Sequence, residues 1–404
     1  MIKRDDYLDE IFKFIDKPFI KVLTGIRRSG KSTLLMLLRK ELQQRGIEGE
    51  RILYINLESF DFDFINTAGE LYSYVKETKT GHRRIYILLD EIQEVAEWEK
   101  AVNALSVDFD VDIYITGSNS KLLSSELATY LAGRYVSFHI NTLSFSEYLM
   151  FKRHRTNTEV DDIYKEFDFY LRMGGFPALH TADYTFETAY KVVYDIYSSI
   201  ILRDTIQRYN IRDVELLERV IKYVFDNIGN IFSAKKIADF FKSQQRKIDL
   251  NTVYNYLNAL ESAFLICRVQ RYDVRGKEIL KTLEKYFVND LALIYSVMGY
   301  KDRMISGMLE NIVFLELRKR GYSVFVGKAG DKEIDFVAHK GGKKIYVQVA
   351  YLLPDQTTID REFNPLLKLR DHYPKYVVTM DKTWADNING IEHKHIADFL
   401  LMKM

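Results

Sequence analysis

Residues 25–32, GIRRSGKS, decide the fold of this 404-residue chain. They fit the pattern G-x-x-x-x-G-K-[ST], whose glycines let the backbone curl so that successive amide groups point at phosphates. The apolar run 19–23 before them indicates a buried strand, and residues 32–44 after them indicate a helix. A strand, this loop and a helix in that order predict a phosphate-binding loop at a helix N-terminus.

The loop pattern also predicts which residues hold a nucleotide. We expect Lys31 to reach the β- and γ-phosphates and the Ser32 hydroxyl to bind Mg²⁺. ATP and Mg²⁺ are therefore the predicted ligands. The residues expected to surround the phosphates are those of the loop and the start of the helix: Gly25, Ile26, Arg27, Arg28, Ser29, Gly30, Lys31, Ser32 and Thr33.

A second motif is expected at the same edge of the sheet. Residues 51–57 indicate another strand, and the apolar run 84–89 indicates a fully buried one that ends in Asp90 and Glu91. We expect Asp90 to bind the Mg²⁺ shell and Glu91 to orient and deprotonate the attacking water. The alternative is a strand that ends in an acidic turn, and the phosphate loop in the same segment argues against it.

Two further strands supply the remaining candidates for catalysis. After the strand 111–116, Ser118 or Asn119 is expected near the γ-phosphate or the water, and a simple polar turn is the alternative. Arg134 precedes the strand 135–140, and we predict that it stabilises charge on the transferred phosphoryl group, in cis or from a neighbouring subunit. An ordinary surface arginine is the alternative.

The composition excludes several classes of protein. Lys and Arg number 58 against 57 Asp and Glu, so attraction to nucleic acid requires a local patch. The single cysteine, Cys267, excludes an internal disulfide framework and a multi-cysteine metal site. The charged N-terminus has no apolar run of the signal-peptide kind, and no stretch of 18 apolar residues occurs. We expect a cytoplasmic protein without a membrane span.

Several motifs together resemble one family, the predicted bacterial and archaeal AAA+ ATPases of the STAND-like branch. The resemblance implies an ATPase core with the acidic strand separated from the phosphate-loop strand, followed by a long C-terminal region. It implies no particular substrate, and it leaves both a ring and a monomer open. The motifs that carry it are residues 25–32, 89–93 (LDEIQ), 116–120 (TGSNS), 133–134 (GR) and 143–149 (LSFSEYL).

Residues 151–212 are predicted to form a helical lid or connector. Gly and Pro at 174–177 indicate a rigid turn between helices, and residues 184–203 indicate a long helix. Arg203 is a second candidate for the arginine that faces the nucleotide. An ion pair with Asp204 on the helix surface is the alternative.

Residues 213–290 resemble a winged helix-turn-helix. Apolar periodicity indicates helices at 214–224 and 233–241, and a third helix capped by Asn251 and Thr252. A hairpin is expected to follow, with strands near 265–272 and 285–288.

The third of these helices presents polar side chains outward, as a helix that reads the major groove does. Between residues 233 and 285 there are eleven Lys or Arg and six Asp or Glu, which favours contact with DNA phosphates. The alternative is that the module docks a protein partner. The side chains expected to point outward are Asn251, Thr252, Tyr254 and Asn255.

Residues 291–404 resemble the core of PD-(D/E)XK nucleases. Glu310 on a predicted helix and Asp335 on a predicted strand occupy the first two acidic positions. Gln348 stands where the third acid is expected, and Ala350 stands where the lysine is expected. A neutral amide is a poorer ligand for a hard cation and alanine cannot transfer a proton, so we predict a nuclease-like fold without activity.

His393 and His395 share one face of a predicted strand near the end of the chain. Without a third ligand nearby, we expect a structural role for them in preference to metal binding.

The sequence as a whole predicts an α/β protein in four parts. The predicted function is ATP hydrolysis that drives or switches the C-terminal modules, with DNA as a target. The alternative is a nucleotide-dependent switch or protein-interaction scaffold with negligible turnover and no role on DNA. The four parts are a AAA+ core (1–150), a helical lid or connector (151–212), a winged helix-turn-helix (213–290) and a nuclease-like domain (291–404).

Overall fold

The computed structural model divides the chain into two compact units. One consists of residues 1–142 with 262–264, and the other of residues 143–261 with 265–404. The structure describes residues 1–78, 83–120, 133–246, 248–382 and 387–403.

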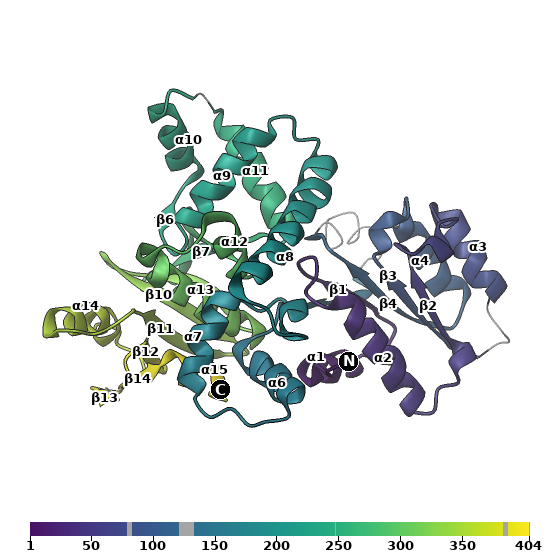
Figure 1. The fold of residues 1–404 in the computed structure, drawn as a ribbon, viewed down its shortest axis with the longest axis horizontal. Helices are drawn as coiled ribbons and strands as arrows, with labels where there is room; N and C mark the ends of the chain where they lie inside the picture. The colour runs from purple at the N-terminus through teal and green to yellow at the C-terminus, as the bar shows by residue number, and fades with distance from the viewer. Residues whose placement is uncertain (79–82, 121–132, 247, 383–386, 404) are drawn as a thin grey trace. The chain divides into compact units, whose positions relative to one another are not determined.

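The first unit is built on a five-stranded parallel sheet (Figure 1). Its strands are β1 (Ile20–Thr24), β2 (Ile52–Asn56), β3 (Ile85–Asp90), β4 (Val111–Gly117) and β5 (Tyr135–His139). They lie in the order β2-β3-β4-β1-β5, so β4 separates the phosphate-loop strand from the acidic strand. The predicted α/β class, the parallel sheet and this separation are confirmed.

Helices cover both faces of this sheet. Leucines and isoleucines of α1 and α2 form one apolar cluster with β1, β3 and β4, while α3 and α4 pack their buried residues against the opposite face. The elements are α1 (Asp5–Phe12), α2 (Lys31–Gln44), α3 (Ala68–Thr78) and α4 (Trp98–Asp108), with short 3₁₀ turns η1 (Gly49–Arg51), η2 (Phe60–Phe62) and η3 (Ile92–Glu94).

The second unit is built on a nine-stranded mixed sheet in the order β13-β14-β12-β11-β10-β9-β7-β8-β6 (Figure 1). The hairpin strands β7 and β8 are antiparallel, and β7 pairs in parallel with β9. Residues 213–290 and 291–404 therefore contribute to one continuous sheet. Its strands are β6 (Ile231–Phe232), β7 (Ile266–Asp273), β8 (Glu278–Val288), β9 (Ser323–Ala329), β10 (Lys332–Lys340), β11 (Lys343–Val349), β12 (Lys375–Thr379), β13 (Asn387–Ile388) and β14 (Ile391–His395).

The helices of the second unit largely follow the predicted periodicity. The amphipathic helices expected near 214 and 233 are present, and Ser233 caps the second by accepting a hydrogen bond from the Lys236 amide at 3.2 Å. The helices are α6 (Phe145–Thr156), α7 (Ile163–Met173), α8 (Phe186–Ser199), α9 (Val214–Asp226), α10 (Ala234–Ser243), α11 (Leu250–Ser262), α12 (Ala292–Met298), α13 (Ile305–Lys319), α14 (Gln356–Leu367) and α15 (Ile396–Leu401), with the short turns η5 (Pro177–His180) and η7 (Asp302–Met304) and the π-helix η6 (Ile200–Gln207).

Two helix boundaries differ from the prediction. The helix α11 begins at Leu250, where the Asp249 carboxylate accepts a hydrogen bond from the Asn251 amide at 2.9 Å, so the predicted cap at Asn251 and Thr252 is wrong. The expected helix 184–203 changes to π geometry at Ile200. Among the described helices, none combines the length and apolar character needed to cross a lipid bilayer.

A buried ion pair joins two central strands of the first unit. Lys21 on β1 contacts Asp112 on β4, and their side chains are 0% and 1% exposed. Asp112 also accepts hydrogen bonds from the Asp16 amide at 2.9 Å and the Tyr114 hydroxyl at 3.0 Å. The Lys21 side of the pair thus lies on β1, the strand that leads into the phosphate loop.

We expect Asp112→Ala to lower the free energy of unfolding by about 3–5 kcal/mol, because it leaves the Lys21 ammonium buried without its counter-charge. The double variant Lys21→Met/Asp112→Ala should recover much of that loss. Urea denaturation of both variants measures it. Equal destabilisation of the single and double variants would contradict this role of the pair.

Candidate functional site

The loop at residues 25–32 has the backbone conformation that its glycines permit. Gly25 and Gly30 have φ of 150° and 96°, and a Cβ at Gly25 would lie 2.2 Å from the Ile140 carbonyl oxygen. Only glycine fits at position 25, because any side chain there would meet backbone. The sequence pattern is thus explained by the curl between β1 and α2.

Lys31 lies within this curl. Its side chain is 3% exposed, and its ammonium group donates hydrogen bonds to the carbonyl oxygens of Gly25 at 3.0 Å and Ile26 at 3.2 Å. It lies 4.0 Å from a carboxylate oxygen of Glu91. The Ser29 hydroxyl oxygen is buried and has no hydrogen-bond partner among the described residues. A cation and an unpaired hydroxyl at the loop suit an anionic ligand.

Ser32 and Asp90, the two residues predicted to bind Mg²⁺, are in direct contact. The Ser32 hydroxyl donates to Asp90 Oδ1 at 3.1 Å, and Asp90 Oδ2 accepts from the Tyr54 hydroxyl at 3.0 Å. Burial raises the pKa of Asp90, while hydrogen bonds from Thr116, Ser32 and Tyr54 oppose that change. Hydroxyl and carboxylate oxygens are the donors that Mg²⁺ prefers, so this site fits the ion.

Thr116 connects the two acidic residues, and sequence reasoning missed it. Its hydroxyl donates to Asp90 Oδ1 at 2.5 Å and accepts from the Glu91 amide at 2.9 Å. Glu91 has a positive φ of 54°, and its carboxylate accepts a hydrogen bond from Gln93 Nε2 at 2.5 Å. The direction of the Glu91 side chain is thus fixed. A threonine at the end of β4, inside the TGSNS motif, was the available signal.

Ser118 and Asn119 directly follow the carboxyl end of β4. Both are fully buried and follow β4, whose Gly117 pairs with Thr24 at the end of β1. They therefore belong to the edge of the sheet that carries the phosphate loop. Contact with the γ-phosphate or the water stays a prediction.

Arg134 lies at the opposite edge. It is exposed, and its carbonyl oxygen accepts a hydrogen bond from the Ile20 amide at the start of β1. The five residues of β1, roughly 16 Å of strand, separate it from the loop. The predicted contact in cis is therefore wrong, and a role from a neighbouring subunit stays a prediction. Arg203 is exposed on η6, and its role also stays a prediction.

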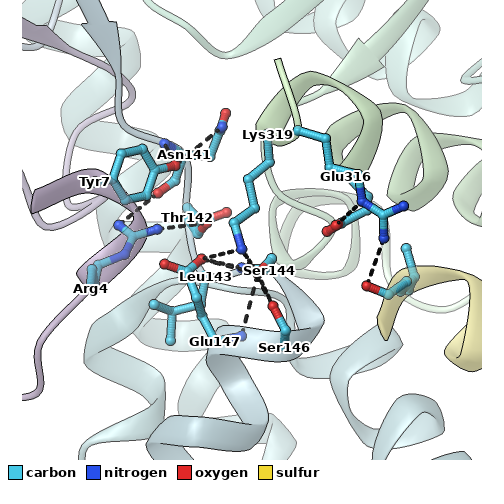
Figure 2. A network of polar contacts seen from close by, with 12 residues as sticks. Arg4, Tyr7, Asn141, Thr142, Leu143, Ser144, Ser146, Glu147, Glu316 and Lys319 are labelled. Atoms are coloured by element: carbon cyan, nitrogen blue, oxygen red, sulfur yellow. Dashed lines mark hydrogen bonds and ion pairs between the residues drawn. The ribbon is translucent and has the colours of Figure 1, made fainter. Parts of the chain in front are cut away.

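Arg4 binds the backbone of the phosphate loop, and no sequence motif indicated this role. Its guanidinium donates to the Ser29 carbonyl oxygen at 3.1 Å. It also donates to the carbonyl oxygens of Asn141 at 3.0 Å and Thr142 at 3.4 Å (Figure 2). Arg4 is 4% exposed, and it packs on the ring of Tyr7. One buried cation thus ties the loop to the residues that follow β5.

The block at 143–149 has a structural role in the second unit. Ser144 accepts a hydrogen bond from the Glu147 amide, and the Glu147 carboxylate accepts one from the Ser144 amide at 3.0 Å, which is a capping box at the start of α6. Lys319 on α13 donates to the Ser144 hydroxyl at 2.9 Å (Figure 2). The motif is therefore explained by helix capping.

Glu310 and Asp335 also come together, around a lysine that sequence reasoning missed. Lys285 on β8 lies 2.8 Å from Glu310 and 3.2 Å from Asp335. The Gln348 side-chain oxygen accepts a hydrogen bond from the Asp335 amide at 3.3 Å, and Ala350 is buried. The sequence contained little sign of this role, because Lys285 is one of the eleven Lys and Arg between residues 233 and 285 that we interpret as favouring DNA contact.

The two histidines make structural contacts. His393 Nε2 lies 2.7 Å from the Thr379 hydroxyl, and His395 Nδ1 accepts a hydrogen bond from the Ala397 amide at 3.1 Å. In the part of the chain that the structure describes, no group of three or more His, Cys, Asp or Glu is arranged to hold a metal ion.

Residues 17–149 match a protein family described as an AAA domain, and residues 164–303 match a domain family of unknown function. The fold and the site thus define an AAA-type P-loop domain. The chain is 43% identical over 403 residues to an uncharacterised protein of Haemophilus influenzae, covering 99% of each. It is 30% identical over 401 residues to an uncharacterised protein of Methanocaldococcus jannaschii, covering 94% of this chain and 86% of that protein. The chain belongs to the family of these proteins.

The fold is also similar to that of a solved structure. A Walker-type ATPase of Pyrococcus abyssi matches with a TM-score of 0.51 at 16% identity, over 74% of this chain and 96% of that one. The likeness extends well beyond the AAA domain.

We expect Arg4→Met to raise the Kd for ATP by about tenfold, the equivalent of about 1.4 kcal/mol, because the loop loses its buried donor and must be ordered on binding. Calorimetric titration with a non-hydrolysable ATP analogue measures the effect. Lys3→Met is the matched control, because Lys3 lies beside Arg4 and pairs with Glu41 on the surface. Equal affinities in both variants would contradict the role of Arg4.

Proposed function

We propose that this protein is an Mg²⁺-dependent ATPase whose nucleotide state acts on the second unit. One observation carries the proposal: Ser32, Asp90, Thr116 and Glu91 form a continuous hydrogen-bonded chain beside Lys31 at one edge of the sheet. These are the residue types that phosphoryl transfer from ATP to water requires. The AAA domain match covers the same residues.

Each side chain has a role in this proposal. Lys31 leaves the loop carbonyls and binds the β- and γ-phosphates, while Ser32 and Asp90 hold Mg²⁺, which supplies charge neutralisation on the phosphate oxygens. Glu91 accepts the proton of the attacking water, and Gln93 keeps the Glu91 carboxylate in place. The buried Ser118 and Asn119 are the candidates for orienting that water or the γ-phosphate.

We expect Lys31→Ala to abolish ATP binding, and Glu91→Gln to retain binding while lowering turnover by about 10²–10⁴-fold, because it removes only the proton acceptor. Calorimetry and phosphate release measure the two effects. Glu94→Gln is the matched control, since Glu94 is exposed on the same turn. Equal ATPase rates in the wild type and both site variants would exclude the assignment.

DNA is the proposed target of the second unit. The order α9, β6, α10, α11, β7 and β8 supports the winged helix interpretation, with β6 and β7 both paired to β8. On α11, the side chains of Asn251, Tyr254 and Asn255 are exposed, as a helix that reads bases requires. The exposed cations on and near α10 are Lys235, Lys236, Lys242 and Arg246.

The positive charge of this region is smaller than the sequence count suggests. Lys285 is buried among carboxylates, so it cannot contact phosphates, and Lys247 lies outside the described residues. Since β7 pairs with β9, the test requires the full chain.

We expect Lys235→Glu/Lys236→Glu to weaken duplex DNA binding and to flatten its salt dependence, each lost phosphate contact lowering the log–log slope by about 0.9. Fluorescence anisotropy of labelled duplex across a salt series measures both. Lys191→Glu is the control, because Lys191 is an exposed lysine on α8 of the same unit. Absence of DNA binding by the wild type at low salt would exclude this target and favour a protein partner.

A second candidate is a nucleotide-dependent switch or scaffold with negligible turnover. It is supported by the contacts of Lys31, which binds the carbonyls of its own loop and lies near Glu91, because phosphate binding would exchange these contacts and so couple nucleotide to the loop. ATPase rates with and without DNA separate the two candidates. Stimulation of the ATPase rate by DNA supports an ATPase that acts on DNA, and a slow rate that does not depend on DNA supports the switch. An ATPase rate per protein molecule that rises with protein concentration would support a homo-oligomer in which Arg134 acts on a neighbouring copy.

A further inference from the structure

A buried lysine lies among three carboxylates in the second unit. The ammonium of Lys285 is 2.8 Å from Glu310, 2.6 Å from Glu333 and 3.2 Å from Asp335. We call these four residues the Lys285 cluster. Lys285 comes from the hairpin strand β8, whereas the carboxylates come from α13 and β10, so the cluster joins the segment before residue 290 to the segment after it.

The Lys285 cluster occupies the place where the nuclease resemblance predicted a degenerate metal site. Glu310 and Asp335 are the two acids of that prediction, and Glu333 is added from the same face of β10, two residues before Asp335. Carboxylates converging from a helix and a strand on one point are what a hard divalent cation requires. In this protein the point of convergence is taken by a side-chain cation.

The contacts of the carboxylates leave little freedom around that point. Asp335 Oδ1 faces Lys285, and its Oδ2 accepts a hydrogen bond from the Val349 amide at 2.9 Å. A Cβ at Gly229 would lie 3.4 Å from the Glu310 carboxyl group, so backbone closes that side. The Glu333 side chain is 37% exposed, whereas Lys285 is 2% exposed. The cluster therefore meets solvent on the Glu333 side.

The third acidic position of a nuclease is engaged elsewhere. The Gln348 side chain accepts from the Asp335 amide at 3.3 Å and donates to the Glu362 carboxylate at 2.9 Å. Both ends of this amide thus have protein partners. An acid at position 348 would instead place a second negative charge beside Glu362.

The electrostatics agree with an internal cation. Burial lowers the pKa of Lys285, but Glu310, Asp335 and Glu333 raise it by more, so the net pKa is raised and the ammonium stays charged. Burial and the neighbouring Asp335 raise the pKa of Glu310 to about 8. Breaking the cluster would leave the Lys285 ammonium buried without its counter-charges.

We propose that the Lys285 ammonium is the permanent cation of this cluster and stands in for a divalent metal ion, so that the wild-type chain takes no metal here and a site for one appears when Lys285 is replaced by a neutral residue. The same contacts lock the hairpin β7–β8 to α13 and β10. The predicted winged helix and nuclease-like parts then move as one body.

The test counts Mn²⁺ bound to nucleotide-free protein by electron paramagnetic resonance, in an Asp90→Asn background that silences the site of the first unit. We expect no binding at the cluster in this background alone. Adding Lys285→Met should create a site for one Mn²⁺ per chain, with a Kd at least about tenfold below the highest Mn²⁺ concentration at which the background shows no binding, because a like charge has left the binding point. Adding Asp335→Asn to Lys285→Met should abolish that gain.

Wild-type binding of Mn²⁺ that depends on Asp335 would overturn the proposal, as would cutting of plasmid DNA that Asp335→Ala abolishes. A folded Lys285→Met variant that gains no site would also overturn it. Where Lys285→Met does not fold, the neutral triple variant Lys285→Met/Glu310→Gln/Asp335→Asn decides. Recovery of a cooperative unfolding transition shows that charge compensation is what Lys285 provides, and failure to recover it overturns the proposal.

Discussion

The hydroxyl of Thr116 donates to Asp90 and accepts from the Glu91 amide, and these two hydrogen bonds hold the acidic turn against the end of β4. The rest of the first unit depends on this constraint, because the loop strand β1 lies on the other side of β4. A shift of β4 by one residue would turn Thr116 to the opposite face. Strand order and register therefore set how the loop, Asp90 and Glu91 are aligned.

The buried pair Lys21–Asp112 is consistent with that reading. It joins the same two strands, β1 and β4, within the core and away from the carboxyl edge. A charged pair at full burial contributes little net stability against an apolar replacement, but its geometry penalises other registers. We infer that the pair fixes the register of β1 against β4. The double variant Lys21→Met/Asp112→Ala distinguishes this role from a contribution to stability, because it removes both charges together.

Local sequence patterns predicted the elements that depend on local physics. The strands of the first unit and the loop between β1 and α2 follow from apolar runs and glycine spacing, which act over a few residues. The same is true of Ser32 and Asp90, since parallel strands bring their carboxyl ends to one edge. Arg134 failed as a contact in cis because nothing in its motif fixed the edge of the sheet at which it lies.

The residues that were missed act across long sequence separations. Arg4 binds carbonyl groups of Ser29 and of residues 141–142, and a carbonyl partner leaves no mark in the sequence. Lys285 meets Glu310 and Asp335 only because β7 pairs with β9, which no local periodicity reveals. Composition counted it as a surface charge, whereas burial makes it an internal one.

The two units treat buried carboxylates in opposite ways, and the difference bears on function. Around Asp90 the partners are the hydroxyls of Ser32, Thr116 and Tyr54, which carry no charge, so the proposed Mg²⁺ would be the exchangeable cation of this carboxylate. Around Asp335 the partner is an ammonium group that cannot leave. A carboxylate with hydroxyl partners can bind and release a metal cation, whereas a carboxylate paired with a lysine ammonium keeps that cation permanently. If nucleotide acts on the second unit as we propose, the hairpin β7–β8 and the elements α13 and β10 respond together. Separating them would leave Lys285 and its carboxylates buried without their partners.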